Sequence, residues 1–201
     1  MNKLDFMFDF ASPNAYFAYK VLPDILQRTG AELVIHPVLL GGLFKITGNQ
    51  PPMVAFGGVK GKLDYEMLES KRFIERHKLD DFTFNANFPM NTISIMRGLL
   101  AAQETGCEKR YIDTVLSAMW ERDLKMDEPE VFKAVLTEAG LDAEKLVALT
   151  QTDAIKDKLK ANTQAAADRG AFGIPTFFVG EEMFFGKDRL GLVEEELLKQ
   201  A

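Results

Sequence analysis

A serine and a proline stand where one local pattern ends and another begins, in the stretch FDFASPNAY, residues 8–16. Ser12 followed by Pro13 is typical of a helix start, because a serine side chain caps the first turn and proline fits the first helical position. The Ser12 hydroxyl can also donate a hydrogen bond to a sulfur atom, which lowers the pKa of that thiol. The pair therefore predicts either a simple cap or a site that holds another molecule's thiolate.

A second candidate is the stretch GIPTF, residues 173–177, in which Pro175 directly precedes a strand pattern. X–Pro peptide bonds can be cis, and a cis bond here would leave the N–H and C=O of Ile174 exposed to an extended peptide ligand. An ordinary trans proline at the start of a strand is the alternative.

A third candidate is FFGKDRL, residues 184–190, which places Lys187 and Asp188 at the start of the last predicted helix. Helix N-termini bind carboxylates, and Asp188 could pair with the ammonium group of a ligand. A plain helix cap explains the same residues equally well.

The elements that position these residues follow from the hydrophobic pattern. Residues 4–10 alternate and predict a strand, and a helix follows up to Gly30, with Pro23 expected to kink or split it. Residues 31–40 predict a second strand, which completes a βαβ unit with parallel strands. Glycine, asparagine and proline crowd residues 41–52, which predict a long loop.

The remainder of the chain divides into a helical block and a strand-rich end. Between about residues 60 and 169, apolar residues recur at helical spacing in segment after segment. After Gly170, a hairpin turning at residues 180–182 and an amphipathic C-terminal helix are expected.

This order predicts an α/β thioredoxin-like domain (βαβ…ββα) with a large all-α insertion. We expect residues 1–58 and 170–201 to form the thioredoxin-like domain and residues 59–169 the insertion. Redox members of this fold carry CxxC at the start of the first helix. Here residues 12–15 read Ser-Pro-Asn-Ala, which excludes a thiol–disulfide oxidoreductase and makes glutathione the candidate for the missing thiol.

Composition excludes several other classes of function. The formal charge is −6, with acidic and basic residues interspersed, which argues against a nucleic-acid-binding or membrane-surface protein. Cys107 is the only cysteine, and the two histidines, His36 and His77, are far apart, so neither a disulfide nor a metal site is expected. No signal peptide or membrane-spanning stretch is seen, and we expect a reduced, cytoplasmic location.

Five motifs, in order and with matching spacing, resemble one known family. FDFASPNAY, GNQPP, NTISIMRG, GIPTFFV and FFGKDRL are together similar to the 2-hydroxychromene-2-carboxylate isomerases, close kin of the kappa-class glutathione transferases. The resemblance runs along essentially the whole chain. It implies the same thioredoxin-like fold with a helical insertion, glutathione as cofactor and a homodimer.

The resemblance also implies roles for single residues around the sulfur atom. Ser12 matches the catalytic serine that contacts the glutathione sulfur, and Asn49 matches an asparagine of the glutathione site. Ile174, followed by Pro175, matches the residue whose backbone pairs with the cysteine of glutathione. Lys45 matches a lysine near the substrate carboxylate, although a solvated loop lysine is an equally good interpretation.

At the other end of glutathione, Lys187 and Asp188 match the pair that holds the γ-glutamyl group. Kappa-class relatives usually have serine where Lys187 stands, which leaves the role of Lys187 open. Phe88, Asn91 and Arg97 resemble family positions near the site, and we assign them no chemistry.

The resemblance thus implies a glutathione-dependent isomerase that acts on a small aromatic or conjugated carboxylate. Two alternatives stay open at this point. One is a kappa-like glutathione transferase or peroxidase that uses the same site for another electrophile. The other is a non-catalytic module that binds glutathione or a peptide.

Overall fold

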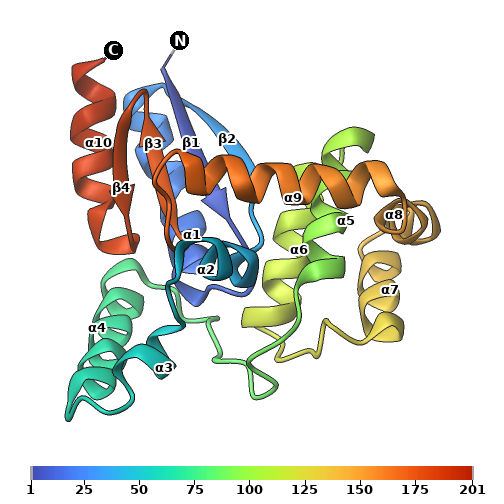
Figure 1. Ribbon diagram of the computed structural model, residues 1–201, viewed down its shortest axis with the longest axis horizontal. Coiled ribbons are helices and arrows are strands. Elements are labelled where there is room, and N and C mark those ends of the chain that lie inside the picture. Colours follow the sequence, from blue (N-terminus) through green and yellow to red (C-terminus); the bar gives the residue numbers. More distant parts are fainter. Residues whose placement is uncertain (1, 201) are drawn as a thin grey trace.

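A four-stranded sheet forms the centre of the thioredoxin-like part of the molecule (Figure 1). The computed structural model describes residues 2–200. The strands are β1 (Lys3–Phe8), β2 (Glu32–Pro37), β3 (Thr176–Val179) and β4 (Glu182–Phe185), in the order β2-β1-β3-β4. β1 pairs with β2 in parallel and with β3 antiparallel, and β3 and β4 form the expected hairpin.

The apolar face of β1 packs against the first and last helices. Leu4, Phe6 and Phe8 are fully buried, as their alternation predicts. α1 (Pro13–Thr29) covers this face, and α10 (Leu190–Lys199), which follows the short 3₁₀ turn η1 (Lys187–Arg189), packs on α1 and β3. Figure 1 shows α1 on the side of the sheet opposite to the long helix α9 (Asp153–Asp168).

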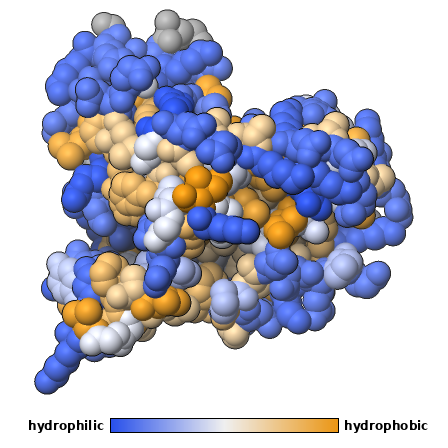
Figure 2. All heavy atoms as spheres, in the orientation of Figure 1, coloured by the Kyte–Doolittle hydropathy of each residue, from blue (hydrophilic) through white to orange (hydrophobic). Residues whose placement is uncertain are grey.

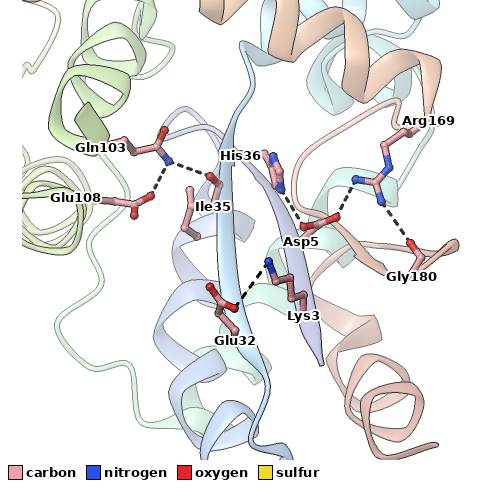
Figure 3. A network of polar contacts seen from close by, with 9 residues as sticks. All are labelled: Lys3, Asp5, Glu32, Ile35, His36, Gln103, Glu108, Arg169 and Gly180. Atoms are coloured by element: carbon pink, nitrogen blue, oxygen red, sulfur yellow. Dashed lines mark hydrogen bonds and ion pairs between the residues drawn. The ribbon is translucent and has the colours of Figure 1, made fainter. Parts of the chain in front are cut away.

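The other face of β1 carries polar residues that find partners within the fold (Figure 3). Asp5 accepts a hydrogen bond from Nε2 of His36 on β2 at 2.9 Å and one from Nη1 of Arg169, directly after α9, at 2.9 Å. Burial raises the pKa of Asp5, but these two partners outweigh it and hold the pKa below its ordinary value. The sequence named no partner for His36, and the structure supplies Asp5.

All the regular secondary structure between β2 and β3 is helical. Its helices are α2 (Leu40–Thr47), α3 (Pro52–Phe56), α4 (Lys62–His77), α5 (Ile93–Thr105), α6 (Glu108–Trp120), α7 (Pro129–Glu138), α8 (Ala143–Thr150) and α9. Trp120 is fully buried at the end of α6 and donates from Nε1 to the carbonyl of Phe10 at 3.0 Å, which ties the insertion to the β1–α1 connection.

One local prediction is wrong and another is narrowed. Of the kink or split expected at Pro23, the split does not occur, because that proline lies on the exposed side of α1, where water can replace the missing backbone donor. Residues 41–52 are not one long loop, since residues 41–47 belong to α2. Gly42 faces α9 there, and a Cβ at this position would lie 3.3 Å from the Thr163 side chain, so the glycine serves close helix packing.

The sheet register brings together the strand ends next to the predicted site residues. β1 ends at Phe8, and Met7 lies opposite Thr176, the first residue of β3. Thr176 in turn lies opposite Phe185, the last residue of β4. The β1–α1 connection, the segment before β3 and the segment after β4 therefore meet at one end of the sheet.

The division into residues 1–58 with 170–201 and residues 59–169 stays a prediction. α9, which the division assigns to the insertion, packs on both α2 and β2. None of the helices within residues 2–200 is both long and apolar enough to cross a membrane.

Candidate functional site

Ser12 is the N-cap of α1, as the Ser-Pro pair predicts. Its backbone is extended (φ −97°, ψ 112°), and its Oγ accepts the Ala15 N–H at 3.2 Å. The same hydroxyl donates to the carbonyl of Ile174 at 3.0 Å, across 162 residues of sequence. The side chain is nearly buried, so one hydroxyl joins the start of α1 to the segment before β3.

Of the two alternatives at Pro175, the segment before β3 has the cis peptide bond, between Ile174 and Pro175. Within residues 2–200, the Ile174 N–H has no hydrogen-bond partner. The loop is fixed on both sides, because Thr176 Oγ1 donates to the carbonyl of Gly173 at 2.7 Å and the Gly186 N–H donates to the carbonyl of Pro175 at 2.9 Å. A fixed loop with a free amide can receive the carbonyl of an extended peptide.

Asn49 follows α2 and lies beside the same loop. Its Nδ2 donates to the carbonyl of Phe172 at 2.7 Å, and its Oδ1 accepts the Gln50 N–H at 2.8 Å. The structure thus joins Asn49 to this loop two residues before Ile174. The side chain lies in an exposed environment, where a ligand can reach it.

Lys187 and Asp188 directly follow Gly186, whose N–H is bonded to the carbonyl of Pro175. The Lys187 side chain is only 5% exposed, and its Nζ lies 3.3 Å from a carboxylate oxygen of Asp188, which is 59% exposed. Nζ also lies 5.4 Å from the centre of the Phe73 ring on α4. A buried ammonium group next to an exposed carboxylate suits the α-carboxylate and α-ammonium of an amino acid.

Lys45 lies on α2 rather than in a loop, and its side chain is exposed. Its side chain forms no salt bridge with any residue that the structure describes. The position alone does not distinguish a substrate-binding lysine from a solvated one.

Asp9 is a buried acidic residue beside the candidate site that the sequence did not single out. Its carboxylate is fully buried and accepts the Ala11 N–H at 2.9 Å and the Leu40 N–H, at the start of α2, at 2.7 Å. The Thr92 side chain also lowers the pKa of this carboxylate. Burial raises the pKa of Asp9 to about 6 even though these bonds lower it.

Asp9 therefore joins the loop that carries Ser12 to α2, which leads into Asn49. The sequence placed Asp9 in the strand predicted over residues 4–10 and Leu40 in the strand predicted over residues 31–40, so a bond from the start of a helix at Leu40 could not be expected. An acidic residue enclosed by Phe8 and Phe10 was the only signal in the sequence.

Apolar side chains are exposed on the helices that follow Asn49. Met53, Val54 and Phe56 on α3 and Val59 before α4 are each at least 39% exposed, and Figure 2 shows apolar residues gathered over α3 and α4. A recess of about 590 Å³ lies elsewhere, at the α5–α6 turn around Cys107, and includes none of the predicted site residues.

Taken together, these groups fit glutathione. The Ser12 hydroxyl lies at the N-terminus of a 17-residue helix, whose dipole favours a negative charge. The Ile174 backbone offers one donor and one acceptor, and Lys187 and Asp188 offer one charge of each sign. Within residues 2–200, no cluster of three or more histidine, cysteine, aspartate or glutamate side chains is arranged to hold a metal ion.

Comparisons with known proteins agree on the fold. The family model for the DsbA-like thioredoxin domain matches residues 3–198. Among solved structures, a 2-hydroxychromene-2-carboxylate isomerase superposes with a TM-score of 0.84 at 27% sequence identity, covering 98% of this chain and 95% of that one.

Two groups of curated relatives match over nearly the full length. A 2-hydroxychromene-2-carboxylate isomerase from Pseudomonas sp. (strain C18) is 30% identical over 95% of this chain and 88% of its own length. Glutathione S-transferase kappa 1 from Rattus norvegicus is 28% identical over 94% of this chain and 88% of its own length.

Proposed function

Because this chain belongs to the DsbA-like thioredoxin family and resembles 2-hydroxychromene-2-carboxylate isomerases over nearly its full length, we propose that it is a glutathione-dependent isomerase of such compounds. It is an enzyme of the isomerase and kappa-transferase group, as its relatives are. The finer assignment concerns the cofactor, the substrate and the roles of single residues.

The observation that carries the proposal is the place of Ser12. Its hydroxyl lies at the helix N-terminus where redox members of the fold place a thiolate, and it faces the peptide-binding loop at Ile174. Ser12 cannot exchange disulfides, so its role is to donate a hydrogen bond to the sulfur of a bound thiol. That bond, together with the helix dipole, would lower the thiol pKa.

The peptide part of glutathione would lie along residues 172–175. The Ile174 N–H donates to no group of the protein within residues 2–200 and is available for the cysteine carbonyl of the cofactor. Asn49 would contact the same segment. Lys187 would bind the α-carboxylate of the γ-glutamyl group and Asp188 its α-ammonium. In this proposal Lys187 has an ionic role, although kappa relatives usually have serine at its position.

Glutathione held by Ser12, Ile174 and Lys187 would supply a thiolate able to add reversibly to a conjugated carbon of the substrate, which is the chemistry that the proposed isomerisation requires. The protein's own side chains would bind the substrate. The exposed apolar residues of α3 would contact the aromatic ring, and Lys45 would pair with the substrate carboxylate.

The test is the ultraviolet spectrum of 2-hydroxychromene-2-carboxylate with the purified protein, with and without glutathione. The proposal predicts conversion that requires glutathione and is reduced about 100-fold or more in Ser12→Ala, in which the oxygen next to the sulfur is lost. Conversion without glutathione would overturn the proposal. Glutathione binding without conversion would instead favour a transferase, the activity in the name of the rat relative.

We also expect a homodimer in the cytoplasm. Light scattering of the purified protein and cell fractionation test these two expectations independently of activity.

A further inference from the structure

The Ser12 hydroxyl has a single hydrogen, and that hydrogen is already engaged. Between a hydroxyl and a carbonyl oxygen only the hydroxyl can donate, so the 3.0 Å contact to Ile174 uses the Ser12 hydrogen. The Ser12 oxygen at the same time accepts the Ala15 N–H at 3.2 Å. In this orientation the hydroxyl offers no hydrogen to a sulfur atom beside it.

Turning the hydroxyl towards a ligand would leave the Ile174 carbonyl without its donor. Ser12 is 4% and Ile174 6% exposed, so little water is present to replace the bond. Within residues 2–200, no other group donates to this carbonyl. A buried carbonyl that loses its only donor is destabilised, and this cost opposes the reorientation of Ser12.

An extended peptide beside residue 174 brings a replacement donor. Its N–H would reach the Ile174 carbonyl and its C=O the free Ile174 N–H, in the pattern of an added strand. Once that N–H occupies the carbonyl, the Ser12 hydrogen can turn away without leaving the carbonyl unpaired. A bond from a hydroxyl to a thiolate is charge-assisted and roughly twice as strong as a neutral one, so the released hydrogen turns to the sulfur.

We propose that the Ile174 carbonyl is a positioning group that holds the Ser12 hydroxyl until the cysteine amide N–H of the ligand replaces it. This inference rests on the proposed function and adds a specificity rule to it. The site activates thiols that carry a peptide N–H on the carbon next to the thiol-bearing carbon. A simple thiol can enter the site, but it leaves the Ser12–Ile174 bond intact, so its pKa is lowered by the helix dipole alone.

The test compares glutathione with an analogue methylated on the cysteine amide nitrogen, each bound to the protein at saturation. The pKa of each bound thiol is measured from its thiolate absorbance, in the wild type and in Ser12→Ala. In the wild type we expect the pKa of bound glutathione to be lower than that of the analogue by about one pH unit or more. In Ser12→Ala the two pKa values should coincide, because no hydroxyl is left to release.

Equal lowering of both pKa values in the wild type would overturn the inference and leave the proposed function standing. No binding of glutathione, or no lowering of its pKa, would overturn both. A crystal structure with glutathione is an independent measurement that does not need the analogue. It should show Ser12 Oγ within hydrogen-bond distance of the glutathione sulfur and the cysteine amide nitrogen of glutathione within hydrogen-bond distance of the Ile174 carbonyl oxygen, and absence of the second contact would also overturn the inference.

Discussion

Replacing Asp9 with asparagine tests the buried carboxylate that joins the Ser12 loop to α2. The pKa of Asp9 is raised from 3.8 to about 6 because the carboxylate is fully buried. Between these two values the folded state therefore binds more protons than the unfolded state, and the contribution of Asp9 to stability falls as the pH rises. At about 1.4 kcal/mol per pH unit, the full shift corresponds to about 3 kcal/mol.

An asparagine at this position cannot titrate, so the variant loses this pH dependence. It also loses one acceptor, because its amide NH₂ faces a backbone N–H at Ala11 or Leu40. We therefore expect Asp9→Asn to be less stable than the wild type at pH 4, with the difference shrinking by about 2 kcal/mol by pH 7.

The assay is urea unfolding of both proteins at half-unit steps between pH 4 and pH 7. Gly191→Ala on α10 is the control, since its added Cβ meets no atom within 4 Å and it changes no titrating group, so its difference from the wild type should stay constant. Parallel pH profiles for the wild type and Asp9→Asn would refute the reasoning that burial raises the pKa of Asp9.

Three further substitutions separate packing from binding. Gly98→Ala on α5 should destabilise the protein by about 2 kcal/mol in denaturant unfolding, because its Cβ would lie 2.2 Å from the buried Tyr111 hydroxyl. The control Gly191→Ala should be neutral or slightly stabilising. Equal changes in the unfolding free energy of the two variants would contradict this. Lys187→Met should leave the unfolding free energy unchanged or raise it by up to about 1 kcal/mol, since a buried charge is removed, but should weaken glutathione binding about tenfold by calorimetry. Asn49→Ala should change stability by less than about 1 kcal/mol and weaken the same binding several-fold, because its bond to the loop is exposed; unchanged affinity would exclude it from the site.

Local patterns carried most of the fold prediction. Ser12 and Pro13 could be identified as a helix start because capping depends only on neighbouring residues. The parallel pairing of the first two strands and the later hairpin were predicted from the βαβ unit and the turn residues, and the structure confirms both. The order of the four strands, and with it the meeting of the segments around residues 12, 174 and 187 at one end of the sheet, comes from the structure.

The errors and omissions concern groups whose partners are distant in the sequence. Gly41 and Gly42 suggested a loop, since the packing of α2 on α9 that favours a small residue cannot be inferred locally. The buried role of Asp9 depends on the N–H of Leu40, 31 residues away. The bond from Ser12 to Ile174 likewise exists only after residues 162 positions apart have been brought together.

The pKa of the glutathione thiol bound to the wild type and to Ser12→Ala tests the central claim most directly. Thiolate absorbance during a pH titration of each complex reports that pKa independently of any substrate. The account predicts a pKa well below the ordinary value of about 8.5 in the wild type and a return towards that value in Ser12→Ala. The same lowered pKa in both proteins would contradict the claim that the Ser12 hydroxyl stabilises the thiolate.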